Sequence, residues 1–123
     1  MIAFLLDEDT HGGLMNAFRR RTRLGILPAV DVTRVGEPDA PPYSTPDPDL
    51  LVWCETNDRV LVSEDKNTLP DHFRDHHRAG RQSPGIILIR PGTSLGEIID
   101  ELILITDAGH PDDFRDQIRY IPL

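Results

Sequence analysis

The chain has 123 residues, of which 38% are hydrophobic and 28% are charged, and its formal net charge at pH 7 is −8. This length suits one globular domain and is too short for two. The negative charge argues against binding nucleic acid through the overall field of the protein, because such binding relies on Lys and Arg near the phosphates. A nucleic-acid partner would therefore need a local basic patch or bound divalent cations.

Compartment signals are few. No apolar run approaches membrane-spanning length, and residues 1–4 lack the basic start of a signal peptide. The single cysteine, Cys54, has no partner for an intramolecular disulfide, which is typical of a reducing compartment. The sequence predicts a cytoplasmic protein with no membrane partner.

Residues 2–6 form a short apolar run that ends in three adjacent carboxylates, Asp7, Glu8 and Asp9. A continuous apolar run predicts a central strand buried on both faces. Two carboxylates about 5 Å apart repel each other by roughly 3 kcal/mol at an effective dielectric of about 20. Water, a helix end or a metal ion is needed to offset that repulsion.

A helix follows, because Leu14 and Phe18 recur at helical spacing. It ends in Arg19, Arg20, Arg21 and Arg23. Basic residues in a last helical turn complement the helix dipole, so this cluster has a structural explanation as well as a functional one. Residues 29–35 alternate apolar and polar and predict a half-buried strand. The Pro-rich segment 36–48 predicts a long surface loop.

Residues 47–57 predict the next helix, with Asp47 as N-cap, Pro48 at the first helical position and Asp49 near the positive end of the dipole. Residues 59–63 predict a third strand, which is followed by the polar segment 64–67.

The second half of the chain continues the alternation of helices and strands. Thr68 and Asp71 suggest a capping box for a helix that runs to about residue 79, and residues 85–90 predict a buried strand. Ser94 and Glu97 form a second capping box, ahead of an apolar stripe at helical spacing. Residues 117–123 could add an edge strand.

This order predicts an α/β domain layered around a mostly parallel sheet. We expect one domain over residues 1–123, with a C-terminal extension from about residue 106. In open α/β sheets, ligands bind beyond the carboxyl ends of the strands. Asp7 follows the first strand, Asp65 follows the third, and Asp47 opens a helix that begins near the same edge. Clusters of carboxylate oxygens suit Mg²⁺ or Mn²⁺, and such ions activate water for phosphodiester hydrolysis.

Each acidic residue also has a structural explanation. Asp47 fits a helix cap as well as a ligand, and Asp49 fits dipole compensation better than ligation. Asp65 could begin a turn, whereas Glu8 and Asp9 could be solvated. His72, which shares its predicted helix with several basic residues, could meet phosphate or belong to a solvated face.

Three segments, "FLLDED", "PDPDLLVWCETNDRVLVSEDKN" and "PGIILIR", together resemble the short bacterial PIN-like domains. The resemblance covers roughly residues 2–105. It implies a three-layer α/β/α PIN-like fold and a Mg²⁺- or Mn²⁺-dependent endoribonuclease. The acidic residues that match the metal site of that family are Asp7, Asp47 and Asp65, and the supporting residues are Glu8, Asp9, Asp49, Lys66 and Asn67. Asn67 stands where the family has a second Asp.

The resemblance also implies partners: an RNA substrate and a small antitoxin protein that covers the site. A second copy of the chain could also be a partner. Lys66 could contact substrate phosphate or simply neutralise nearby carboxylates. A second hypothesis is a non-catalytic PIN-like module that binds protein or RNA. A third is a phosphatase or receiver-type domain, although Lys66, directly after Asp65, is poorly placed for that chemistry.

Overall fold

The computed structural model of the chain describes residues 2–25 and 30–122. Over these residues five parallel strands form one sheet in the order β2-β1-β3-β4-β5, with helices between successive strands. The strands are β1 (Ala3–Leu6), β2 (Asp31–Arg34), β3 (Val60–Ser63), β4 (Ile86–Ile89) and β5 (Ile118–Ile121). The helices are α1 (Leu14–Arg23), α2 (Asp47–Asn57), α3 (Leu69–Arg78), α4 (Leu95–Ala108) and the 3-10 turn η1 (Pro111–Asp113). The predicted α/β/α class is confirmed.

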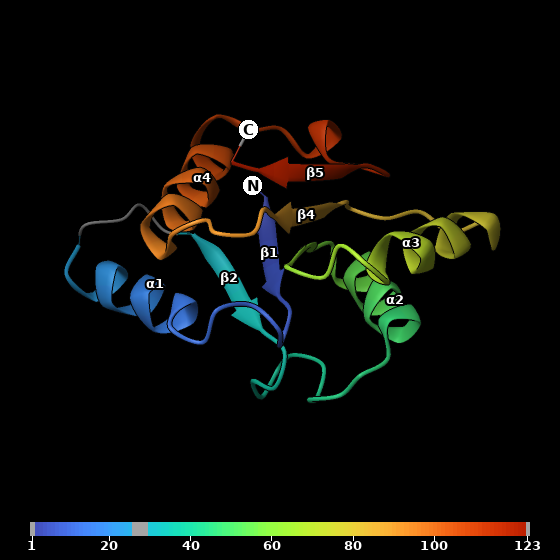
Figure 1. Cartoon of the computed structure of the whole chain (residues 1–123), viewed down its shortest axis with the longest axis horizontal. Coiled ribbons are helices and arrows are strands. Elements are labelled where there is room, and N and C mark those ends of the chain that lie inside the picture. The colour runs from blue at the N-terminus through green and yellow to red at the C-terminus, as the bar shows by residue number, and fades with distance from the viewer. Residues whose placement is uncertain (1, 26–29, 123) are drawn as a thin grey trace.

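The helices form two outer layers around the sheet. Helices α1 and α4 pack on one face and α2 and α3 on the other (Figure 1). Alternate residues of β1 enter the two cores: Phe4 and Leu6 face α1 and α4, whereas Leu5 faces α2 and α3. This double burial explains why β1, β3 and β4 read as continuous apolar runs rather than as alternating ones.

Most predicted elements agree with the structure within a few residues. The capping box at α4 is confirmed, because the Ser94 hydroxyl accepts from the Glu97 N–H at 3.2 Å and the Glu97 carboxylate accepts from the Ser94 N–H. The segment 106–123 supplies the end of α4, η1 and the edge strand β5. Ala29, which the sequence assigns to the second strand, lies outside the described residues. None of the described helices is long and apolar enough to cross a membrane.

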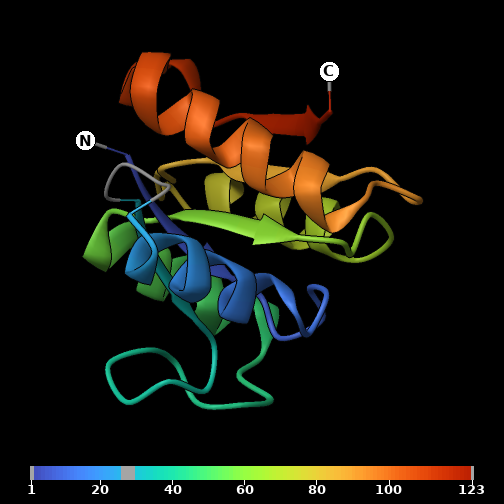
Figure 2. The ribbon, with the colours of Figure 1, turned by 90° about the vertical axis from the view of Figure 1, so that its left-hand side faces the viewer.

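The strand order places a topological switch between β1 and β3. From β1 the chain crosses to β2 on one side, and it then returns past β1 to β3 on the other side (Figures 1 and 2). In doubly wound sheets the crevice beyond the carboxyl ends of such a strand pair is the usual ligand site. Asp7 extends the pairing of β1 with β3, because its N–H donates to the Val62 carbonyl at 2.9 Å.

Gly85, just before β4, has a conformation that only glycine adopts easily. Its φ is +116°, and a Cβ at this position would lie 2.1 Å from the backbone oxygen of Phe114. Its own carbonyl accepts the Leu61 N–H at 3.2 Å, which ties the start of β4 to β3. A side chain here would therefore push apart the start of β4 and the segment that leads into β5.

We expect Gly85→Ala to lower the free energy of unfolding by roughly 3 kcal/mol or more, because strain and a backbone clash add together. Gly92→Ala is the matched control: its φ is +80° and no atom lies within 4 Å of the added Cβ, so only about 1–2 kcal/mol of backbone strain applies. Urea unfolding measures both variants. Equal losses would show that the contact with Phe114 is unimportant.

Candidate functional site

Asp7 is a buried carboxylate at the end of β1. The residue is 9% exposed, and its side chain accepts the Glu8 N–H at 2.8 Å and the Ser63 hydroxyl at 3.0 Å. Within the described residues no Lys, Arg or His nitrogen lies within 4.0 Å of it. Burial, together with repulsion from Asp9 and Asp47, raises the pKa of Asp7 from 3.8 to about 6, although both hydrogen bonds oppose the shift.

Ser63, the last residue of β3, joins Asp7 to Asp9. Its fully buried hydroxyl lies 3.0 Å from a carboxylate oxygen of Asp7 and 3.3 Å from one of Asp9, and it accepts the Asp65 N–H at 3.1 Å. One hydroxyl hydrogen cannot donate fully to two carboxylates. The Ser63 hydroxyl can therefore donate well to only one of the two carboxylates at a time.

The Asp47 carboxylate, at the start of α2, lies near Asp7 and Asp9. The predicted N-cap role is wrong: the cap position is Pro46, and no side chain caps this end of the helix. The Asp47 carboxylate instead lies 3.9 Å from the His72 ring on α3. Burial is the main reason why the pKa of Asp47 is raised; His72 opposes the shift, whereas Asp65 and Asp9 add to it.

Asp65 lies near Asp9 and Asp47, but its carboxylate is engaged in stabilising the turn that follows β3. Its carboxylate accepts the N–H groups of Asn67 and Thr68, at 3.0 and 3.1 Å, and the Thr68 hydroxyl. The Thr68 hydroxyl is the main cause of the lowered pKa of Asp65. The predicted capping box between Thr68 and Asp71 is absent, because the Thr68 side chain turns back to Asp65 rather than capping α3.

Of the five predicted supporting residues, only Asp9 lies beside Asp7. The side chains of the other four do not join the carboxylates of Asp7, Asp9, Asp47 and Asp65. Glu8 turns away and accepts the Ser44 N–H at 2.7 Å, so it anchors the Pro-rich loop. Asp49, Lys66 and Asn67 are exposed, and Asn67 contributes its backbone N–H to Asp65.

Arg34, at the end of β2, holds the loop that carries the carboxylates. Its guanidinium donates to the carbonyls of Glu8 at 3.0 Å and Thr10 at 3.4 Å. The Thr10 hydroxyl donates to the Asp7 carbonyl at 2.7 Å, so the loop is fixed from two sides. Sequence reasoning missed Arg34, Ser63 and Thr68. A signal existed for Ser63, which is the only polar residue of an otherwise apolar strand next to carboxylates.

The donor set suits a hard divalent cation. All donors are oxygens, as Mg²⁺ and Mn²⁺ prefer. In the described part of the chain no three His, Cys, Asp or Glu side chains are grouped closely enough to hold a metal ion. Mg²⁺ usually takes only one or two carboxylates and keeps several waters. Asp7 and Asp9, which both lie beside the Ser63 hydroxyl, would be the protein ligands of such an ion.

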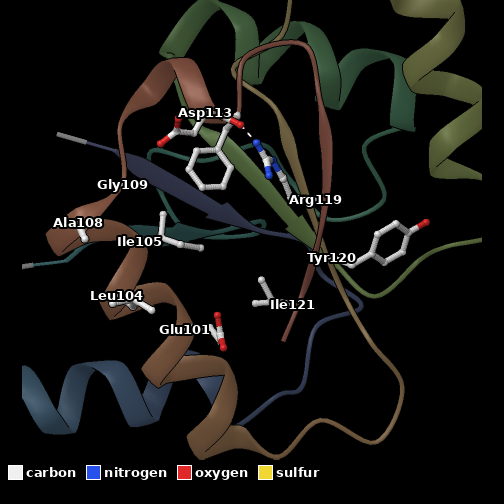
Figure 3. A pocket seen from close by; sticks show the side chains of 10 residues that line it. Glu101, Leu104, Ile105, Ala108, Gly109, Asp113, Arg119, Tyr120 and Ile121 are labelled. Carbon is white, nitrogen blue, oxygen red and sulfur yellow. Dashed lines mark hydrogen bonds between the residues drawn. The ribbon is translucent and has the colours of Figure 1, made fainter. Parts of the chain in front are cut away.

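An apolar cavity of about 380 Å³ lies elsewhere, between α4 and β5. Figure 3 shows Leu104 and Ile105 of α4 beside Ile121 of β5, with Arg119 donating to the Asp113 carbonyl at 3.1 Å. The cavity contains none of the residues that sequence reasoning selected. The acidic edge between β1 and β3 is the better candidate site, because it combines the switch point with perturbed carboxylates.

The shifted pKa of Asp7 predicts a pH-dependent stability. Asp7 titrates near pH 6 in the folded protein and at 3.8 in the unfolded chain, so the folded state binds more protons between these values. The free energy of unfolding therefore falls as the pH rises through this window, by on the order of 3 kcal/mol. Asp7→Asn removes this loss. Without divalent ions at about pH 7, we expect the variant to be more stable than the wild type.

Thermal unfolding in EDTA from about pH 4 to 7 measures the difference, which should shrink to near zero at the acidic end. Asp49→Asn, which removes an exposed carboxylate from the first turn of α2, is the control and should not gain stability. An Asp7→Asn variant that is less stable than wild type at neutral pH would contradict this description of the carboxylate.

Comparisons with protein-family models, with curated proteins and with solved structures found no match.

Proposed function

We propose that the protein is a Mg²⁺- or Mn²⁺-dependent ribonuclease of PIN-like type that hydrolyses phosphodiester bonds at the carboxyl edge of β1 and β3. The observation that supports this function is the position of Asp7, Asp9 and Asp47 around the switch point, where a buried carboxylate has no counter-cation among the described residues. A divalent ion would supply the missing positive charge. Asp65, whose pKa is lowered, adds negative charge to the same edge.

Each acidic residue of the site would have a separate role in hydrolysis. A bound ion supplies an activated water and neutralises charge on the phosphate. Asp7 and Asp9 would hold the ion, and the Ser63 hydroxyl fixes the oxygens that they present. Asp47 is more exposed than Asp7, and its raised pKa makes it a better proton acceptor than an ordinary carboxylate. We assign Asp47 the role of taking a proton from the attacking water.

The resemblance extends the proposal to partners and compartment. The chain would be the toxin of a toxin–antitoxin pair in the cytoplasm, and a small antitoxin would cover the acidic edge. The chain could also pair with a second copy of itself. Cys54 is buried, and burial raises its pKa to about 12. Its thiol therefore stays protonated near neutral pH and packs as an apolar group.

The second candidate function is a PIN-like module that binds RNA or protein without cutting. The net charge of −8, which opposes simple binding of a phosphate backbone, favours the second function. Asn67 adds to it, because it offers an amide at a position where the related domains carry a carboxylate.

Stability in the presence of Mn²⁺ separates the two functions. A ligand that binds only the folded state at 100 times its dissociation constant adds about 2.7 kcal/mol to the free energy of unfolding. We expect a clear rise in melting temperature for wild type and for Asp49→Asn, and little or none for Asp7→Asn. A melting temperature that Mn²⁺ leaves unchanged in all three proteins would favour the non-catalytic module.

Cleavage of a labelled single-stranded RNA with Mn²⁺ tests the chemistry. We expect Asp7→Asn and Asp47→Asn each to lose on the order of 100-fold in rate or more, and Asp49→Asn to cleave like wild type. Ser63→Ala should lose less of the cleavage rate, because it removes the hydroxyl that orients Asp7 and Asp9 but leaves both carboxylates in place. Equal cleavage by Asp7→Asn and wild type would contradict the proposal.

A further inference from the structure

Helix α1 is positively charged, whereas the chain as a whole is negatively charged. It carries four of the thirteen Lys and Arg residues of the chain and none of the 21 acidic residues. Basic residues in a last turn complement the helix dipole. Like charges three and four positions apart also repel each other, as Arg20 and Arg19 do with Arg23. The dipole alone therefore does not explain a cluster of four arginines.

Two of the four arginines have carboxylate partners and two do not. Arg19 pairs with Glu37, and Arg21 lies 3.8 Å from Asp100. Arg20 and Arg23 are exposed, and neither has a carboxylate within 4.0 Å in the part of the chain that the structure describes. These two guanidinium groups are available to an external anion.

Arg20 and Arg23 line a groove of about 450 Å³ that α1 forms with Leu95, at the start of α4. Figure 2 looks onto these two helices. Gly13 and Asn16 line the same groove, and the spacing of Gly13, Asn16, Arg20 and Arg23 puts all four on one face of the helix. Gly13 comes only four residues after Asp9. The groove therefore starts close to the acidic edge and follows α1 away from it.

We propose that this groove binds the phosphate backbone of single-stranded RNA, with Arg20 and Arg23 each contacting one phosphate. The proposal rests on the proposed ribonuclease function, and it gives the substrate a path from the carboxylates along α1. Asn16 lies between the two ends of that path and can donate to a sugar or a phosphate. Ala17 and Leu95 give the lining of the groove an apolar part.

The overall charge of −8 does not prevent this binding. Arg20 lies about 9 Å along the helix axis from Leu14, and Arg23 lies farther still. The Debye length is about 10 Å at 0.1 M salt, so the carboxylates that precede α1, of which Asp9 is the nearest in the sequence, are largely screened from Arg23. A basic groove of this kind attracts a single strand without reading its sequence.

Fluorescence anisotropy with a labelled oligouridylate about 12 nucleotides long, in EDTA, tests the proposal without cleavage. The test variant is Arg20→Ala/Arg23→Ala. The control is Arg74→Ala/Arg78→Ala on α3, whose arginines are also exposed but lie near Asp71 and Asp75. Both double variants change the net charge equally, so a difference between them reports position rather than total charge. Thermal unfolding checks that both are folded.

We expect the test variant to bind on the order of tenfold more weakly at about 0.1 M salt, and its slope of log affinity against log salt to fall by about 1.4, which is 0.7 for each lost phosphate contact. The control should match wild type in affinity and slope. Equal losses in both double variants, unchanged binding in the test variant, or no binding by wild type would overturn the proposal. If binding behaves as expected while Mn²⁺-dependent cleavage is absent, the groove is upheld and the ribonuclease function fails alone.

Discussion

The close approach of the Asp7 and Asp9 carboxylates, which both contact the Ser63 hydroxyl, is the constraint on which the candidate site depends. Two carboxylates share one donor, and the more buried of them has a pKa raised to about 6. A protein selected only for stability would place an amide or an apolar side chain at Asp7, because an uncompensated buried charge is costly. This cost is understandable if the carboxylate works with a ligand that brings positive charge.

The fold supplies the rigidity that keeps this arrangement together. Strands β1 and β3 are central in the sheet and buried on both faces, so the backbone at Asp7 and Ser63 is held by the ladder. Arg34 fixes the following loop through two carbonyl groups. Helices α2 and α3 then bring Asp47 and His72 to the opening of the same edge. The sheet and the Arg34 contacts therefore hold the Asp7 and Asp9 carboxylates close together despite their mutual repulsion.

The sequence predicts the architecture well because the architecture follows from local patterns. Buried apolar runs predict β1, β3 and β4, and the Ser94 capping box predicts the start of α4. The same patterns bring Asp7, Asp47 and Asp65 to one edge.

The direction of individual side chains is not a local property, and here the sequence predicts less. Glu8 turns to Ser44, 36 positions away, where the loop adopts a φ of +64°. Asp47 lies inside the helix rather than capping it, and Thr68 turns back to Asp65. Each of these choices depends on a partner distant in the chain or on the detailed course of a turn, which apolar spacing does not encode.

The most direct test is calorimetric titration of Mn²⁺ into the protein near pH 6, in buffers of different ionisation enthalpy. A cation that binds at Asp7 must displace the proton from a carboxyl that is about half protonated at this pH, so about half a proton or more should leave per ion bound. Asp7→Asn should bind weakly and release fewer protons. Tight binding of Mn²⁺ with the same proton release in wild type and Asp7→Asn, or no binding by wild type, would contradict the account.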